Sequence, residues 1–147
     1  MTWISPIKHT LAELRRLGYH AAIVERWNQR AKVRHDLFGA INVVAVRTKV
    51  TIVAHEDAFG YHVPECDWQD YGVFGIQACS ATDAARREAK VRALAADPVS
   101  PIRAWLEAGN RLEIWAWGIK LEVHKRTDGK SRKRKVASLD RRVINLG

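Results

Sequence analysis

Two polar residues interrupt segments of the chain that are otherwise apolar. Asn42 is the second residue of the run Ile41–Val46, and Gln77 lies between Ile76 and Ala78. A buried amide needs hydrogen-bond partners, so each of these residues calls for an explanation. Taken singly, each could face outward at a strand end or bond to a neighbouring loop. Considered together with nearby acids, they indicate a polar site.

Carboxylates stand close to both amides in the sequence. Glu25 lies in the preceding apolar segment, and Asp36 precedes the turn 37–39 that leads into the Asn42 segment. If these segments are neighbouring strands, Glu25, Asn42 and Gln77 converge at one end of a sheet, with Asp36 beside them. Such oxygen atoms suit Mg²⁺, which polarises a phosphate and lowers the pKa of a bound water. The sequence therefore predicts a Mg²⁺ or Mn²⁺ site.

The apolar patterns predict one α/β domain with a mixed central sheet flanked by helices. Helices are expected between Ser5 and Gly18, from Thr82 to Asp97 and over Ile102–Ala108, and strands over 19–27, 41–46, 50–54, 73–79, 111–117 and 136–144. The segment 56–70 is expected to be a loop, and 127–129 a hairpin turn. In the second helix, Ala84, Ala85, Ala89, Leu94 and Ala95 are expected to face inward. Trp27, Trp105 and Trp115 are expected in the core, and Trp68 on the surface.

The charge is concentrated at the C-terminal end. The chain has 25 Lys and Arg against 16 acidic residues, and from 122 to 147 nine basic residues stand against three acidic ones. A polyanion is the partner that this favours, because neutralised phosphates release counterions. The alternative is a solvated tail that only aids solubility. The predicted DNA contacts are Arg34, Arg86, Lys125, Arg126, Lys130, Arg132, Lys133, Arg134 and Lys135.

The same division suggests a core at 1–121 and a basic segment at 122–147, which forms a hairpin or an extension of the same domain. No apolar run is long enough to cross a bilayer, and no signal-peptide pattern is present, so a cytoplasmic location is expected. Cys66 and Cys79 are the two cysteines, and a zinc site formed by them with His55 and His62 has no recognisable spacing.

Three runs near the start of the chain resemble the opening of the PD-(D/E)XK nucleases, in the phage and bacterial branch related to Holliday-junction resolvases. They are Leu14–Tyr19, Val24–Trp27 and Arg34–Ala45, and Gly75–Ser80 resembles the third-strand metal motif of that fold. The resemblance covers about residues 11 to 120. It implies a restriction-endonuclease-like core, Mg²⁺- or Mn²⁺-dependent cleavage of branched DNA, a homodimer, and a bacterial or phage-infected host cell.

Carried over residue by residue, the resemblance implies a role for each site residue. Glu25 matches an outer metal ligand, Asn42 falls where the family has its metal-bridging Asp, and Gln77 falls where it has Glu, Asp or Gln. Cys79 falls where the family usually has Lys. Some members supply that Lys from the following helix, where Lys90 is the best candidate, so Asn42, Gln77 and Lys90 become the expected catalytic residues.

Two departures from the family pattern follow. Asn42 offers one carbonyl oxygen and no charge, which weakens Mg²⁺ binding. Either the chain is an Asp→Asn form that has been inactivated, which we favour, or a natural protein has lost cleavage and kept binding. Cys79 cannot act as a cation. Lys90 shares a helix face with Arg86, and the alternative for both is a solvated face or simple phosphate contact.

Three functions remain open at this point. The leading hypothesis is a metal-dependent endodeoxyribonuclease that prefers branched DNA. The second is a non-catalytic DNA-binding module in which Asn42 is natural. The third is a basic assembly protein that binds nucleic acid only incidentally, with binding that disappears at modest salt.

Overall fold

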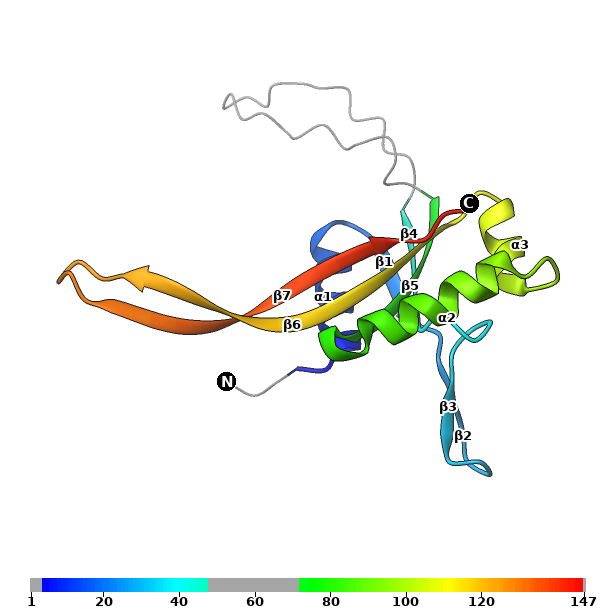
Figure 1. The fold of residues 1–147 in the computed structure, drawn as a ribbon, viewed down its shortest axis with the longest axis horizontal. Coiled ribbons are helices and arrows are strands. Elements are labelled where there is room, and N and C mark those ends of the chain that lie inside the picture. Colours follow the sequence, from blue (N-terminus) through cyan, green and yellow to red (C-terminus); the bar gives the residue numbers. More distant parts are fainter. Residues whose placement is uncertain (1–3, 48–71, 147) are drawn as a thin grey trace, which may run out of the picture.

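A five-stranded mixed sheet runs through the molecule, and helices lie on both of its faces (Figure 1). The computed structural model describes residues 4–47 and 72–146. In chain order the elements are α1 (Pro6–Arg16), β1 (His20–Ile23), β2 (Arg26–Asn28), β3 (Val33–His35), β4 (Val43–Arg47), β5 (Gly72–Ser80), a 3-10 turn (Ala81–Asp83), α2 (Ala84–Ala96), α3 (Pro101–Glu107), β6 (Arg111–Lys125) and β7 (Ser131–Val143).

The sheet has the strand order β1-β4-β5-β6-β7. β4 is antiparallel to β1 and to β5, β6 is parallel to β5, and β7 is antiparallel to β6. The parallel pair needs a crossover, which α2 and α3 supply. The predicted α/β fold, with a mixed central sheet flanked by helices, is confirmed. No helix in the described ranges is long and apolar enough to cross a membrane.

Alternate residues of the central strands fill two cores, one on each face of the sheet. Phe74 and Ile76 of β5 pack with Leu14 of α1 and Trp115 of β6. The other face carries the second core, which α2 and α3 cover and which includes Ile41, Val91, Ala95, Ile102, Leu112 and Ile114. β5 is buried over most of its length because it lies between strands and between helix layers.

The N-terminal strand prediction was wrong in one respect. The segment 19–27 is not one strand: β1 ends at Ile23, and β2 pairs with β3 in a separate two-stranded sheet. Trp27 is therefore 57% exposed, not in the core, because β3 is the one described strand that lies beside β2. Trp115 is fully buried and Trp105 packs against the core, as predicted. Several predictions concern residues outside the described ranges: the strand 50–54, the loop 56–70, Trp68, His55, His62 and Cys66.

The second helix also differs in its buried face. Thr82 lies in the 3-10 turn, so α2 begins at Ala84, and its buried residues are Ala84, Val91 and Ala95. Ala85 and Ala89 are exposed, contrary to the prediction. Alanines give little amphipathic contrast, so the larger Val91 and the residues that share its face decide which side of the helix packs on the sheet.

The strand after α3 is longer than predicted and continues beyond the body of the sheet. β5 pairs with β6 as far as Trp117, and from there β6 has only β7 beside it. Residues 118–138, called the arm here, form a two-stranded ribbon that projects to one side (Figure 1). The basic segment 122–147 therefore contains the end of β6, the turn and the whole of β7.

A buried carboxylate ties β6 to β7 near the base of the sheet. Both oxygens of Glu113 accept hydrogen bonds from Arg141, at 3.0 and 2.9 Å, and Arg111 donates at 3.3 Å. The two guanidinium groups lie over aromatic rings, Arg141 on Trp115 and Arg111 on Phe74. A buried charge is tolerated when it is paired and hydrogen-bonded in this way.

We expect Glu113→Gln to lower the free energy of unfolding by about 2 kcal/mol, because one acceptor oxygen becomes an N–H donor that faces guanidinium donors and the other oxygen loses its charge. Urea denaturation measures the change. Glu107→Gln is the matched control, because Glu107 is 54% exposed and pairs only with Arg103 on its own helix, so its effect should stay within about 0.5 kcal/mol. Equal effects of the two substitutions would contradict a structural role for Glu113.

Candidate functional site

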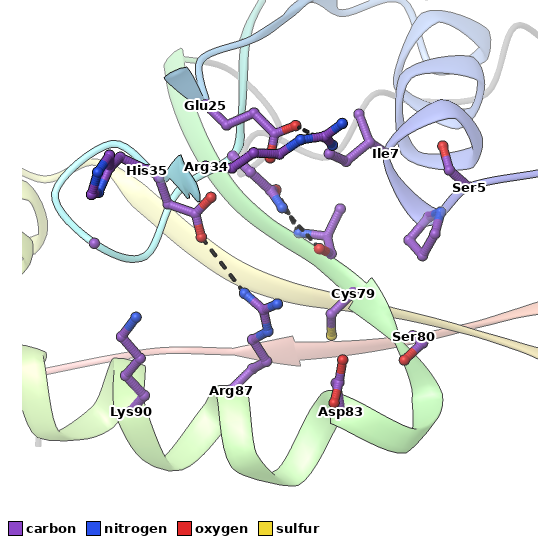
Figure 2. Close-up of a pocket in the computed structure, with 15 residues that line it drawn as sticks. Ser5, Ile7, Glu25, Arg34, His35, Cys79, Ser80, Asp83, Arg87 and Lys90 are labelled. Carbon is purple, nitrogen blue, oxygen red and sulfur yellow. Dashed lines mark hydrogen bonds and ion pairs between the residues drawn. The ribbon is translucent and has the colours of Figure 1, made fainter. Parts of the chain in front are cut away.

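A cavity of about 620 Å³ lies where β4 begins and β5 ends, beside α2 (Figure 2). Its lining includes Glu25, Asp36, Asn42, Cys79 and Lys90, which the sequence placed in one site. Arg34 and Arg87 also line it. Gln77 does not line the cavity but bonds to residues that do, and Arg86 lies outside it.

Asn42 uses its whole side-chain amide on neighbouring groups. Its Oδ1 accepts from the Ala78 backbone N–H at 2.8 Å, and its Nδ2 donates to the Ala78 carbonyl at 2.9 Å. The regular β4–β5 pairing starts at Val43 and Ile76, and the chain before Asn42 turns away. The Asn42 side chain therefore completes the hydrogen bonding of β5 where β4 no longer runs beside it.

Gln77 joins Asn42 to Asp36. In the amide orientation that satisfies its neighbours, its nitrogen donates to Asp36 Oδ2 at 3.1 Å and to the Ala40 carbonyl at 2.7 Å, and its oxygen accepts from Asn42 Nδ2 at 3.0 Å. Both hydrogens of Asn42 Nδ2 then have acceptors. The convergence predicted for Asn42, Gln77 and Asp36 is present, as a connected and buried polar network.

Each of the three carboxylates that line the cavity, Glu25, Asp36 and Asp83, pairs with an arginine. Glu25 accepts from Arg34 at 3.1 Å, and Asp36 Oδ2 lies 3.6 Å from Arg87 (Figure 2). Glu25 lies between β1 and β2 rather than on a strand that contains Trp27. Arg87, which reaches from α2 to Asp36, was not among the site residues predicted from the sequence, because helical spacing alone could not distinguish it from its neighbour Arg86.

The remaining predicted residues have different surroundings. Lys90 extends from α2 at the cavity, and no ion pair of Lys90 is found with the described residues (Figure 2). Arg86 pairs with Asp83 at 3.1 Å on the exposed side of the helix. Cys79 is buried, and desolvation raises the pKa of its thiol. A neutral thiol therefore stands where the family resemblance implies a lysine.

With Asn at position 42, this donor set does not fit Mg²⁺ or Mn²⁺. Such ions need oxygen atoms that can turn toward them. The Nδ2 group of Asn42 directs its hydrogens at the Ala78 and Gln77 oxygens, so an N–H donor lies between the oxygens that a cation would need. Glu25 and Asp36 are neutralised by arginines. In residues 4–47 and 72–146, no group of three or more His, Cys, Asp or Glu is placed to hold a metal.

We expect Asn42→Asp to lower the free energy of unfolding in EDTA by about 3 kcal/mol, because the Ala78 carbonyl and the Gln77 oxygen lose their donor and face a buried carboxylate. Denaturant titration measures the change, and Asn145→Asp, which alters an exposed Asn, is the matched control. Recovery of stability on adding Mg²⁺ would show that the carboxylate creates a cation site. An unchanged stability in EDTA would contradict the role assigned to the Asn42 amide.

Comparisons with protein-family models, with curated proteins and with solved structures gave no match to this chain.

Proposed function

We propose that this protein binds duplex DNA through the arm and that the cavity beside Asn42 is not a catalytic metal centre. The observation that carries the proposal is the charge of the arm. Residues 118–138 contain eight basic and two acidic side chains. Of the eight, the described structure pairs only Lys120 with a carboxylate, Glu122 at 3.5 Å. Such a surface is complementary to a phosphate backbone.

The shape of the arm supports the same partner. A two-stranded ribbon is narrow enough to enter the major groove of DNA. Residues that are partners in the β6–β7 register lie on the same face of the ribbon. One face therefore carries Ile119, Leu121 and Val123 of β6, and on that same face Lys135 and Lys133 of β7 are the partners of Leu121 and Val123. Those three apolar side chains are all more than half exposed. The other face carries Arg132 and Arg134 of β7 beside their β6 partners His124 and Glu122, so both faces of the ribbon present cations.

The catalytic alternative is a metal-dependent endonuclease on a restriction-endonuclease-like core. The element order supports such a core: a helix, three antiparallel strands, helices, and a strand parallel to the third. One cavity that gathers Glu25, Asp36, position 42 and Lys90 also favours it. Branched DNA and a homodimer belong to this second candidate. We rank it below binding because Asn42 and Gln77 commit their amides to each other and to the Ala78 backbone.

We expect the double substitution Arg132→Gln and Arg134→Gln to weaken binding to a labelled duplex at least about tenfold at 0.1 M salt. The slope of log K against log salt should also become shallower by about 2, because each lost phosphate contact removes about one unit. Fluorescence anisotropy over a salt series measures both quantities.

The matched control is Arg92→Gln with Arg103→Gln, which makes the same charge change. Each of these arginines is paired with a glutamate on its own helix, away from the arm. If the two double variants weaken binding equally, the effect comes from net charge, and the arm is not the binding surface.

Cleavage assays separate the two candidate functions. With a four-way junction and a linear duplex in Mg²⁺ or Mn²⁺, we expect the wild-type chain to bind and leave both uncut. Cleavage by the wild-type chain would overturn the non-catalytic proposal. Cleavage by Asn42→Asp alone would identify Asn42 as the residue that prevents catalysis. If neither cleaves while both bind, binding without catalysis is supported.

A further inference from the structure

A second ribbon projects from the body of the protein, and the arm does not account for it (Figure 1). It is the hairpin of β2 and β3, residues 26–35, called the basic hairpin here. It contains Arg26, Arg30, Lys32 and Arg34 and no acidic residue. Among the described residues, Arg34 is the one of these four with an ion pair, to Glu25 just outside the hairpin. Its three-residue strands pair only with each other.

Trp27 is the unusual residue of the basic hairpin. It is 57% exposed, and it belongs to neither of the two cores. The register pairs Trp27 with Arg34, so the ring and a guanidinium share one face of the hairpin. A hairpin this small gains little stability from its own pairing, and an uncovered tryptophan adds none from burial. Packing among the described residues therefore gives no structural explanation for the exposed ring.

A hollow of about 640 Å³ lies along the basic hairpin. Its lining is Arg26, Trp27, Asn28, Gln29, Arg30 and His35, which combines one aromatic ring with cations and amides. The turn beside it is held in shape, because Asn28 Oδ1 accepts from the backbone N–H groups of Arg30 at 3.0 Å and Ala31 at 3.1 Å. His35 also lines the cavity beside Asn42, so the two hollows adjoin through this residue.

An aromatic platform surrounded by cations matches the chemistry of an unpaired nucleotide. Stacking on Trp does not depend on base identity, and nearby arginines neutralise the flanking phosphates. A protein partner with an apolar surface would leave the cations Arg26, Arg30 and Lys32 facing it without carboxylates. A paired base offers its ring faces only to its neighbours in the stack, so a fully paired duplex cannot use the Trp27 platform.

We infer that the basic hairpin binds an unpaired base of a nucleic acid, with the base stacked on Trp27 and a flanking phosphate held by Arg30, in the turn that lines the same hollow. The inference rests on the proposed binding of duplex DNA by the arm, and it defines the ligand further. The preferred ligand is a duplex with a single-stranded segment beside it, the duplex lying on the arm and the unpaired base on Trp27.

The test compares two ligands that share one duplex, one blunt and one carrying a short single-stranded tail, in binding titrations at fixed salt. Trp27→Ala should weaken binding to the tailed ligand by roughly 5- to 100-fold, the range expected for loss of one base–aromatic stack, and change binding to the blunt duplex by less than about twofold. Trp27→Phe, which keeps a ring, should recover most of the affinity. Val33→Ala is the matched control, because Val33 is exposed on the opposite face of the same hairpin.

A tail with abasic sites sharpens the test, because it keeps the phosphates and removes the bases. The wild-type chain should bind the abasic tail as weakly as Trp27→Ala binds the normal tail, and Trp27→Ala should not distinguish the two tails. Equal losses from Trp27→Ala and Val33→Ala would overturn the inference, since both would then act through hairpin folding. An unchanged affinity of Trp27→Ala for the tailed ligand would also overturn it.

The arm variants distinguish a failure of the inference about the basic hairpin from a failure of the proposed function. If Arg132→Gln with Arg134→Gln weakens binding while Trp27→Ala does not, the arm is supported and the inference about the basic hairpin fails. If the wild-type chain binds neither ligand, the proposed function fails, and the inference fails with it.

Discussion

The pair of hydrogen bonds between the Asn42 amide and the Ala78 backbone is the interaction on which the site depends. The regular pairing of β4 with β5 begins at Val43, just after Asn42, and the chain before Asn42 turns sharply through Phe38 and Gly39, both at positive φ. Without a side chain in place of the missing strand, a backbone N–H and carbonyl of the central strand would be buried and unsatisfied. An amide offers one donor group and one acceptor group, as a strand does, whereas a carboxylate offers only acceptors.

The requirement to satisfy the β5 backbone concerns the buried network beside the cavity and not the charged surface of the protein. Gln77 extends the network from Asn42 to Asp36, and Arg87 neutralises Asp36 from the other side. Most cations without an ion pair in the described structure lie on two ribbons that leave the body in different directions (Figure 1), whereas Lys90 lies at the cavity. The proposed polyanion-binding surface and the buried polar network therefore belong to different parts of the fold.

The sequence predicted the parts of the molecule in which pattern and packing agree. The apolar run around Gln77 and the alternation from Arg111 to Trp117 predicted the central strands, and the two amides with a nearby acid predicted that Asn42, Gln77 and Asp36 lie together. The hydrogen-bond partners of Asn42 could not be predicted, because Ala78 contributes backbone groups that any residue would carry. Trp27 was misplaced because aromatic residues are usually core, and only the break after Ile23 shows that its strand leaves the sheet. Arg87 was missed because three consecutive polar residues, Arg86 to Glu88, give helical periodicity little to distinguish.

The arm has a further consequence for how binding would respond to temperature. Beyond the base of the arm, where Gly118 lies near Ala81 and Ala137 packs on the core that includes Leu14, the described structure places neither a third strand nor a helix over it, so the ladder of amides there is shielded by side chains alone. Amide hydrogen exchange in such a ribbon proceeds through openings that cost far less than global unfolding. A duplex lying on it would act as the missing layer. Association would then include the entropy of ordering the ribbon, and it would bury the exposed row of Ile119, Leu121 and Val123 with a negative heat-capacity change.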